Sequence, residues 1–167
     1  MPGKPSFIYW DSCVFLSYLN ADPGRIDTLD AILDEIQKSN GEKRIVTSIL
    51  TKVEVAWSAI EHTTQTLSTA VEQTIDNLWN NESVIGFIEL HEGIAIRARD
   101  LMRQSLTQGW SLKPPDAIHL ASAQWIGVEE LHTYDDKLPR YGTMIGCKIC
   151  EPYITQLRIT FDQGTSY

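Results

Sequence analysis

The sequence predicts an α/β fold in which helices cover both faces of a central, mostly parallel sheet. Short apolar runs with strand character alternate along the chain with longer segments in which apolar residues recur every three to four positions. Because helices separate the strands, the connections should cross over the sheet and give parallel strands between two helical layers. The 167 residues, of which 43% are hydrophobic, suffice for one sizeable core and are too few for two. We therefore predict a single domain spanning residues 1–167.

The first half of the chain is expected to contain two strands and four helices. The run FIYW at 7–10 predicts a strand, and the residues up to Asn20 predict a helix that ADPG closes. A second helix is expected between Arg25 and Gly41, and RIVTS at 44–48 predicts the next strand. Two consecutive helices, ILTKVEVAWSAIEH and TLSTAVEQTIDNLWNN, should follow. The apolar stripe of the second consists of Leu67, Val71, Ile75, Leu78 and Trp79.

The second half continues the alternation. SVIGFIEL at 83–90 predicts a strand, which is followed by a long helix up to Gly109 and by a helix from about Pro115 to Gly127. ELHTYDD at 130–136 predicts a strand that ends in a turn, and ITQLRITF at 154–161 predicts a last edge strand. The single Cys-x-x-Cys pair at 147–150 has too few ligands for structural zinc, so its cysteines are interpreted as buried small hydrophobes. We also assign Trp57, Trp79 and Trp125 to core positions.

Composition limits the classes of function. With 22 acidic and 14 basic residues the chain has a formal net charge of −8, so the molecule as a whole repels phosphate backbones. Any nucleic-acid role must rest on a local patch, for which Lys113, Lys137 and Arg140 are candidates because they lie near acids in the sequence. Three cysteines, no basic leader and no apolar run of about 18 residues favour a protein of the reducing cytoplasm without a membrane span.

Four acids are expected at one edge of the sheet. Asp11 and Asp135 lie where predicted strands end, and Glu54 and Asp116 lie in the first turns of predicted helices. Ligands of open α/β sheets bind beyond the carboxyl ends of the strands, where all four acids would converge. Converging carboxylates repel one another unless a cation compensates, and oxygen ligands without a His or Cys cluster favour Mg²⁺ or Mn²⁺.

Each acid also has a structural interpretation. Asp11, alone or with Ser12, has the position of a helix cap, and Thr51 and Glu54 satisfy the spacing of a capping box. Asp116 follows two prolines at a helix start, where the helix dipole stabilises a carboxylate. Aspartates such as Asp135 and Asp136 are common in turns. His119 is interpreted as a packing or surface residue, and Thr133 as a strand residue whose hydroxyl lies beside Asp135.

The segments that carry these acids resemble PIN-domain ribonucleases, particularly the VapC-type toxins of type II toxin–antitoxin systems. They are FIYWDSCVFLSYL, TSILTKVEV, PPDAIHLASA and LHTYDDKL. The resemblance implies a three-layer α/β/α sandwich, an Mg²⁺ or Mn²⁺ site, cleavage of RNA, a cognate antitoxin that covers the active-site groove, and a homodimer. It assigns the ligands to Asp11, Glu54, Asp116 and Asp135, with Asp136 as an adjacent candidate for the fourth. The chain departs from shorter family members by a longer middle helix pair and a C-terminal extension from about residue 150.

The function expected from these residues is metal-dependent hydrolysis of RNA phosphodiester bonds. One ion would activate a water molecule, and the same ion or a second one would stabilise the leaving oxygen. The alternative is a non-catalytic PIN-like scaffold that binds RNA or a protein. A nucleotide-binding module is less favoured because no Gly-rich phosphate loop follows any predicted strand.

Overall fold

A five-stranded parallel sheet forms the centre of the molecule. The computed structural model describes residues 3–155, and in these the strand order is β3-β2-β1-β4-β5. In the register, Tyr9 of β1 lies beside Val46 of β2 and Leu131 of β4. The predicted α/β class with parallel strands is confirmed. The strands are β1 (Ser6–Trp10), β2 (Lys43–Ser48), β3 (Ile85–Ile88), β4 (Glu130–His132) and β5 (Lys148–Cys150).

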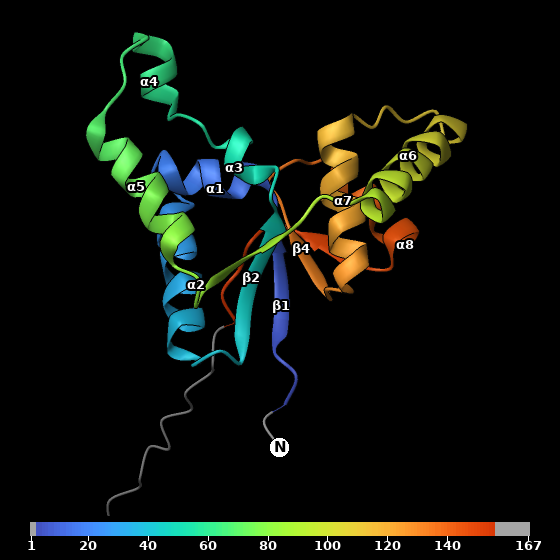
Figure 1. Cartoon of the computed structure of the whole chain (residues 1–167), viewed down its shortest axis with the longest axis horizontal. Helices are drawn as coiled ribbons and strands as arrows, with labels where there is room; N and C mark the ends of the chain where they lie inside the picture. Colours follow the sequence, from blue (N-terminus) through green and yellow to red (C-terminus); the bar gives the residue numbers. More distant parts are fainter. Residues whose placement is uncertain (1–2, 156–167) are drawn as a thin grey trace, which may run out of the picture.

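Helices form a layer on each face of the sheet. Figure 1 shows α1 (Ser12–Leu19), α2 (Ile26–Lys38) and α5 (Thr69–Asn80) on one side. On the other side lie α6 (Glu92–Thr107), α7 (Pro114–Ile126) and α8 (Gly142–Ile145), the last preceded by the 3₁₀ turn η1 (Leu138–Tyr141). The short helices α3 (Thr51–Glu54) and α4 (Ala59–Thr64) follow β2, and α4 projects away from the sheet. The result is a three-layer α/β/α sandwich.

Strand β1 contributes to the core on both faces. Tyr9 packs with the α6 and α7 side, whereas Trp10 packs with the α1, α2 and α5 side, and neither residue is exposed. Side chains alternate between the faces of a strand, so consecutive large residues in FIYW fill opposite cores. This double burial explains why the strand is a continuous apolar run instead of an alternating one.

The helix predicted at 49–62 is in fact two helices. Val55 leaves the helical conformation, with φ −94° and ψ 61°, and Ser58 starts α4 with a capping box in which its side chain and that of Glu61 bond each other's backbone N–H. The capping box expected for Thr51 and Glu54 is absent: Thr51 instead pairs with Thr47, at 2.7 Å between hydroxyls. A helix that restarts at Ser58 leaves Glu54 free to serve another purpose.

Several side chains assigned to the core are exposed. Leu67 precedes α5 instead of joining its apolar stripe and is 82% exposed, and Trp57 and Trp125 are 51% and 56% exposed. The assignments of Leu67 and Trp57 were wrong because both residues lie outside the helices, and that of Trp125 was wrong because helical spacing does not show whether another layer covers a face. Trp79, in contrast, packs against the core on the α1 side.

The end of the chain differs from the prediction in one further respect. CKIC contributes a strand of the sheet, β5, which the sequence analysis did not assign. The edge strand predicted at 154–161 lies, from residue 156 onward, outside the described residues, and Ile154 and Thr155 have no regular structure. That residues 1–167 form one domain stays a prediction. Between residues 3 and 155, no helix is both long and apolar enough to cross a bilayer.

Candidate metal centre

The sheet topology brings the four predicted acids to the carboxyl edge. Asp11 directly follows β1, and Glu54 ends α3, the short helix after β2. Asp116 lies in the first turn of α7, and Asp135 lies three residues beyond β4. Burial raises the pKa of the Asp116 carboxyl above its usual value, and the negative charge of Asp135 is the next cause. Asp11 and Glu54 raise it further, while His119 lowers it. The other three acids therefore lie within electrostatic range of Asp116, and we call the four of them the acid site.

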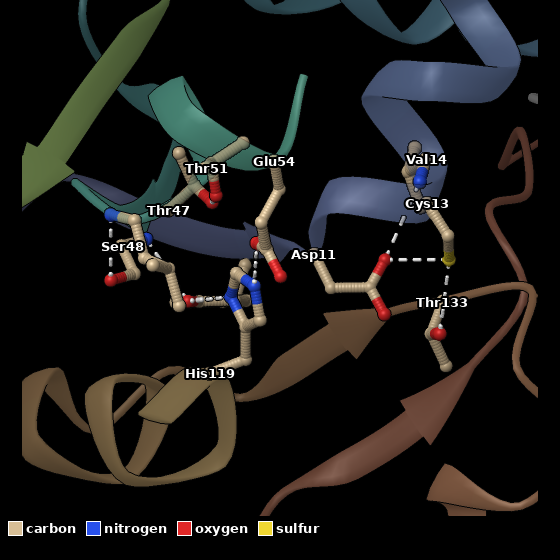
Figure 2. Close-up of polar contacts among 11 residues, drawn as sticks. Asp11, Cys13, Val14, Thr47, Ser48, Thr51, Glu54, His119 and Thr133 are labelled. Atoms are coloured by element: carbon tan, nitrogen blue, oxygen red, sulfur yellow. Dashed lines mark hydrogen bonds and ion pairs between the residues drawn. The ribbon is translucent and has the colours of Figure 1, made fainter. Parts of the chain in front are cut away.

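Asp11 is the most buried member of the acid site, with 6% of its surface exposed. It caps α1 as the sequence suggests, because its Oδ1 accepts the Val14 N–H at 3.4 Å. The same oxygen accepts a hydrogen bond from the Cys13 thiol at 2.8 Å (Figure 2). Burial nevertheless raises the pKa of Asp11, although the bonds from Cys13 and Thr133 oppose the shift. A bound cation would stabilise the ionised form.

Glu54 is held by a buried histidine. His119 Nε2 lies 2.6 Å from Glu54 Oε2 (Figure 2), and its Nδ1 lies 2.7 Å from the hydroxyl of Tyr9. The Tyr9 hydroxyl also accepts the backbone N–H of Ser48 at 3.0 Å. We call Ser48, Tyr9, His119 and Glu54 the His119 network. Its elements β2, β1, α7 and α3 all end or begin at the carboxyl edge.

The sequence analysis interpreted His119 as either a packing or a surface residue. It is not a surface residue, because only 1% of it is exposed. It is also more than a packing residue, since both ring nitrogens are bonded. One signal in the sequence pointed to it: His119 is three residues after Asp116, on the same face of the helix, in an otherwise apolar segment. Its partner, 65 residues away in the sequence, could not be identified from spacing.

Asp135 combines a turn with a free carboxylate oxygen. Its backbone N–H bonds the Thr133 hydroxyl at 3.0 Å, and its Oδ1 accepts the Lys137 N–H at 2.9 Å. The role in a turn that the sequence suggests therefore occupies Oδ1 of Asp135. None of the described hydrogen bonds uses its Oδ2. Asp136 is exposed and is not among the charges that shift Asp116. The arrangement thus favours Asp135 over Asp136 as the fourth member of the acid site.

The donors of the acid site suit a hard divalent cation. Four carboxylates supply oxygen ligands, which Mg²⁺ and Mn²⁺ prefer, and His119 has no nitrogen free for coordination. Burial is the main cause that raises the pKa values of Asp11 and Asp116, so a cation at this site would favour their ionised forms. The residues present therefore fit such an ion.

A second group of potential ligands lies elsewhere in the sheet. Glu130, His132 and Cys150 have ligand atoms within 4.8 Å of one another. However, Trp10 Nε1 donates to His132 Nδ1 at 3.1 Å, which leaves the ring proton on Nε2, the atom that faces Glu130 at 3.2 Å. Glu130 is also bonded by Lys148 at 3.0 Å and by the Tyr153 hydroxyl at 2.6 Å. We call Trp10, His132, Glu130, Lys148 and Tyr153 the His132 network. Their polar groups bond one another without a metal.

Fold and acid site together define an α/β/α protein with an acidic carboxyl edge. A model of the PIN domain family matches residues 8–143, and the chain belongs to this family. No curated protein matches the sequence. The resemblance inferred from the four segments is confirmed.

Solved structures share the fold at low sequence identity. VapBC2 from Rickettsia felis, bound to a promoter DNA fragment, matches with a TM-score of 0.63 at 14% identity over 89% of this chain and 99% of that one. VapBC-1 from nontypeable Haemophilus influenzae matches with a TM-score of 0.60 at 14% identity over 87% and 97%. VapC20 from Mycobacterium tuberculosis, a Sarcin-Ricin loop cleaving toxin, matches with a TM-score of 0.60 at 13% identity over 81% and 95%.

Proposed function

We propose that the protein is an Mg²⁺- or Mn²⁺-dependent endoribonuclease whose ligands are Asp11, Glu54, Asp116 and Asp135. The observation that carries the proposal is the placement of these four acids at the carboxyl edge of the sheet, where burial and the charges of the other three acids raise the pKa of Asp116. Such crowding of negative charge is unfavourable without a cation and is typical of sites that hold one. Membership of the PIN domain family and the likeness in fold to a Sarcin-Ricin loop cleaving toxin support the same reaction.

The residues of the acid site would hold the ion in a fixed position. When bound, a divalent ion supplies the positive charge that favours attack of water on phosphorus and departure of the leaving oxygen. Asp11 is fixed by the Val14 N–H and the Cys13 thiol, so its Oδ2 keeps one direction. Asp135 is fixed by the turn to Lys137. Rigid carboxylates lose little freedom on binding a cation.

RNA requires positive charge near this acidic edge. Lys113 precedes α7 and Lys137 follows Asp135, and both are exposed. Arg140 lies over the rings of Trp110 and Tyr141, at 5.1 and 5.5 Å, which holds the guanidinium in place. Arg25 adds a cation that the sequence analysis did not name: it lies 3.8 Å from the ring centroid of Tyr134, the residue before Asp135. We propose that these residues contact the phosphates of the substrate.

We further propose a cognate antitoxin as partner, a homodimer, and a cytoplasmic location. Structures that share the fold include VapBC complexes. The segment around α4 exposes large apolar side chains, and a cavity of about 320 Å³ opens there. Exposed large apolar side chains that gather in one segment are typical of protein interfaces. Those of the segment around α4 are Val53, Trp57, Ile60 and Leu67.

The activity is tested by RNA cleavage with and without Mn²⁺, using the protein and the variant Asp116→Asn. We expect the protein to cleave only with the ion and the variant to lose cleavage while circular dichroism shows an intact fold. Undiminished cleavage by the variant would contradict the assignment. Calorimetric titration separates the enzyme from a non-catalytic scaffold, which would take up no Mn²⁺.

The partner is tested by co-purification with the product of the adjacent reading frame. We expect Trp57→Ser to weaken this complex without changing RNA cleavage by the isolated protein. Light scattering during size-exclusion chromatography tests the homodimer, and the mass of a monomer at micromolar concentration would contradict it.

A further inference from the structure

We propose that His119 is a positioning residue that orients the Glu54 carboxylate for the metal ion, and that Tyr9 fixes its tautomer. This inference rests on the proposed function, because it concerns a ligand of the same site. It adds a residue that binds no metal itself and acts through Glu54. The hydrogen bonds of the His119 network carry it (Figure 2).

The direction of each hydrogen bond in the network follows from its first donor. The Ser48 backbone N–H can only donate, so the Tyr9 oxygen accepts it. A tyrosine phenol keeps its proton at neutral pH and can donate it to one acceptor. Among the described hydrogen bonds, His119 Nδ1 is the acceptor available to that proton. A neutral imidazole whose Nδ1 accepts carries its hydrogen on Nε2, and this N–H donates to Glu54 Oε2.

Glu54 needs such a partner because its own backbone holds it weakly. It is the last residue of the four-residue helix α3, and the next residue, Val55, has left the helical conformation. A glutamate side chain has three rotatable bonds, and that of Glu54 remains 22% exposed. The bond from His119 engages Oε2 and leaves Oε1 available to a cation. The histidine therefore selects the direction of the free oxygen.

Helix α7 links this ligand to Asp116. His119 lies three residues after Asp116, so both side chains extend from the same face of one helix. The helix is held tightly, because Ala117, Leu120 and Ala121 are fully buried beneath it. Thus α7 supplies one carboxylate directly and orients a second that belongs to α3. Partners that bond a metal ligand in this way typically contribute about 10- to 100-fold to metal affinity.

The test compares His119→Gln with His119→Leu. The amide nitrogen of glutamine reaches the place of Nε2 and can donate to Glu54, whereas leucine cannot. Both variants remove the ring nitrogen Nδ1 that accepts from Tyr9, so the bond between Tyr9 and the imidazole is lost in both. We expect His119→Leu to bind Mn²⁺ about 10- to 100-fold more weakly in calorimetry, and His119→Gln to recover most of that loss. Raising the Mn²⁺ concentration should restore RNA cleavage by His119→Leu.

The tautomer gives a readout that does not depend on metal or activity. We expect ¹⁵N NMR of the metal-free protein to show His119 protonated on Nε2 and unprotonated on Nδ1. In Tyr9→Phe, which removes the donor to Nδ1, the Nδ1-protonated form should become populated. A ring protonated on Nδ1 alone in the unaltered protein would overturn the proposed role of Tyr9.

The outcomes separate this inference from the function on which it rests. If His119→Leu bound Mn²⁺ as tightly as the unaltered protein, or if His119→Gln lost as much affinity as His119→Leu, the positioning role would be overturned and the nuclease would stand. If the unaltered protein bound no Mn²⁺, both would be overturned. Circular dichroism of each variant confirms that the comparison is made between folded proteins.

Discussion

Two buried histidines on opposite faces of the sheet have the same hydrogen-bonding pattern and different surroundings. Tyr9 and Trp10, consecutive residues of β1, each bond an Nδ1 atom, that of His119 and that of His132. In both networks Nε2 then faces a glutamate, Glu54 or Glu130. Glu130 is also bonded by Lys148 and Tyr153, whereas Glu54 lies beside three other acids. We therefore expect the same pattern to serve stability where the glutamate has cationic and hydroxyl partners, and to serve the proposed metal binding where it has neighbouring acids instead.

The largest expected effect is a difference in RNA cleavage between variants of Glu54 and Glu130. We expect Glu54→Gln to reduce Mn²⁺-dependent RNA cleavage by at least about 100-fold, because a ligand should matter no less than a partner of a ligand. Glu130→Gln should stay within a few-fold of the unaltered protein. Initial rates at saturating RNA measure both. Equal losses in the two variants would show that the networks do not differ in function.

The two histidines should differ in metal affinity but not in stability. His132→Leu leaves the buried Trp10 N–H without an acceptor, which should cost about 1–3 kcal/mol in the free energy of unfolding. His119→Leu leaves the Tyr9 hydroxyl in the same condition, so a similar cost is expected. Urea unfolding measures both, and Mn²⁺ titration provides the contrast. A loss of Mn²⁺ affinity in His132→Leu would contradict the division between the networks.

Acid should affect the two groups of carboxylates in opposite directions. The pKa values of Asp11 and Asp116 are raised in the folded state, so it binds their protons more tightly than the unfolded state. Their contribution to the stability of the metal-free protein should therefore increase as pH falls through these raised values toward the ordinary 3.8. Glu130 behaves inversely. Although burial opposes it, bonds from Tyr153 and Lys148 hold the pKa of Glu130 below its usual value, so its contribution is lost as pH falls through that lowered value.

Urea unfolding of the metal-free protein and of Asp116→Asn between pH 7 and about pH 4 measures the first effect. The variant should be more stable than the unaltered protein at pH 7, and the advantage should shrink as the medium becomes more acidic. Saturating Mn²⁺ should reverse the order at pH 7. A constant difference across this range would mean that Asp116 is not crowded by negative charge.

The smallest expected effect concerns the outer end of the His132 network. Tyr153→Phe removes one hydrogen bond to Glu130 from a side chain that is 43% exposed. We expect a loss of about 0.5–1 kcal/mol in the free energy of unfolding, with no change in Mn²⁺ affinity. Thermal unfolding followed by circular dichroism measures it, and Glu130→Leu is the control that removes the acceptor.

Much of the fold could be predicted because periodicity and helix-ending residues are local. The order of strands and helices, the parallel sheet and the approach of four acids to one edge all follow from which residues come after each strand. The break at Val55 could not be placed, because two capping patterns compete: Thr51 with Glu54, and Ser58 with Glu61. Only the second forms, since Thr51 bonds Thr47 and Glu54 bonds His119.

The hydrogen-bond partners within the site could not be predicted from the sequence. The bond between His119 and Glu54 joins residues on α7 and α3 that are 65 positions apart, and nothing local indicates it. The exposure of Trp57, in the bend between α3 and α4, and of Trp125 on α7 likewise depends on whether another layer covers them. Long-range contacts of this kind depend on how the layers pack, which a single sequence does not contain.

Because Tyr9 and Trp10 are neighbours on β1, the register of this one strand determines whether both networks can form. Side chains alternate along a strand, so a slip of β1 by one residue would exchange their faces. Tyrosine would then face His132 and tryptophan would face His119, and both hydrogen-bond sets would be lost together. A chain misfolded in this way would be unstable and unable to bind metal at the same time. Correct strand pairing is thereby a condition of activity, so a mispaired chain would be inactive.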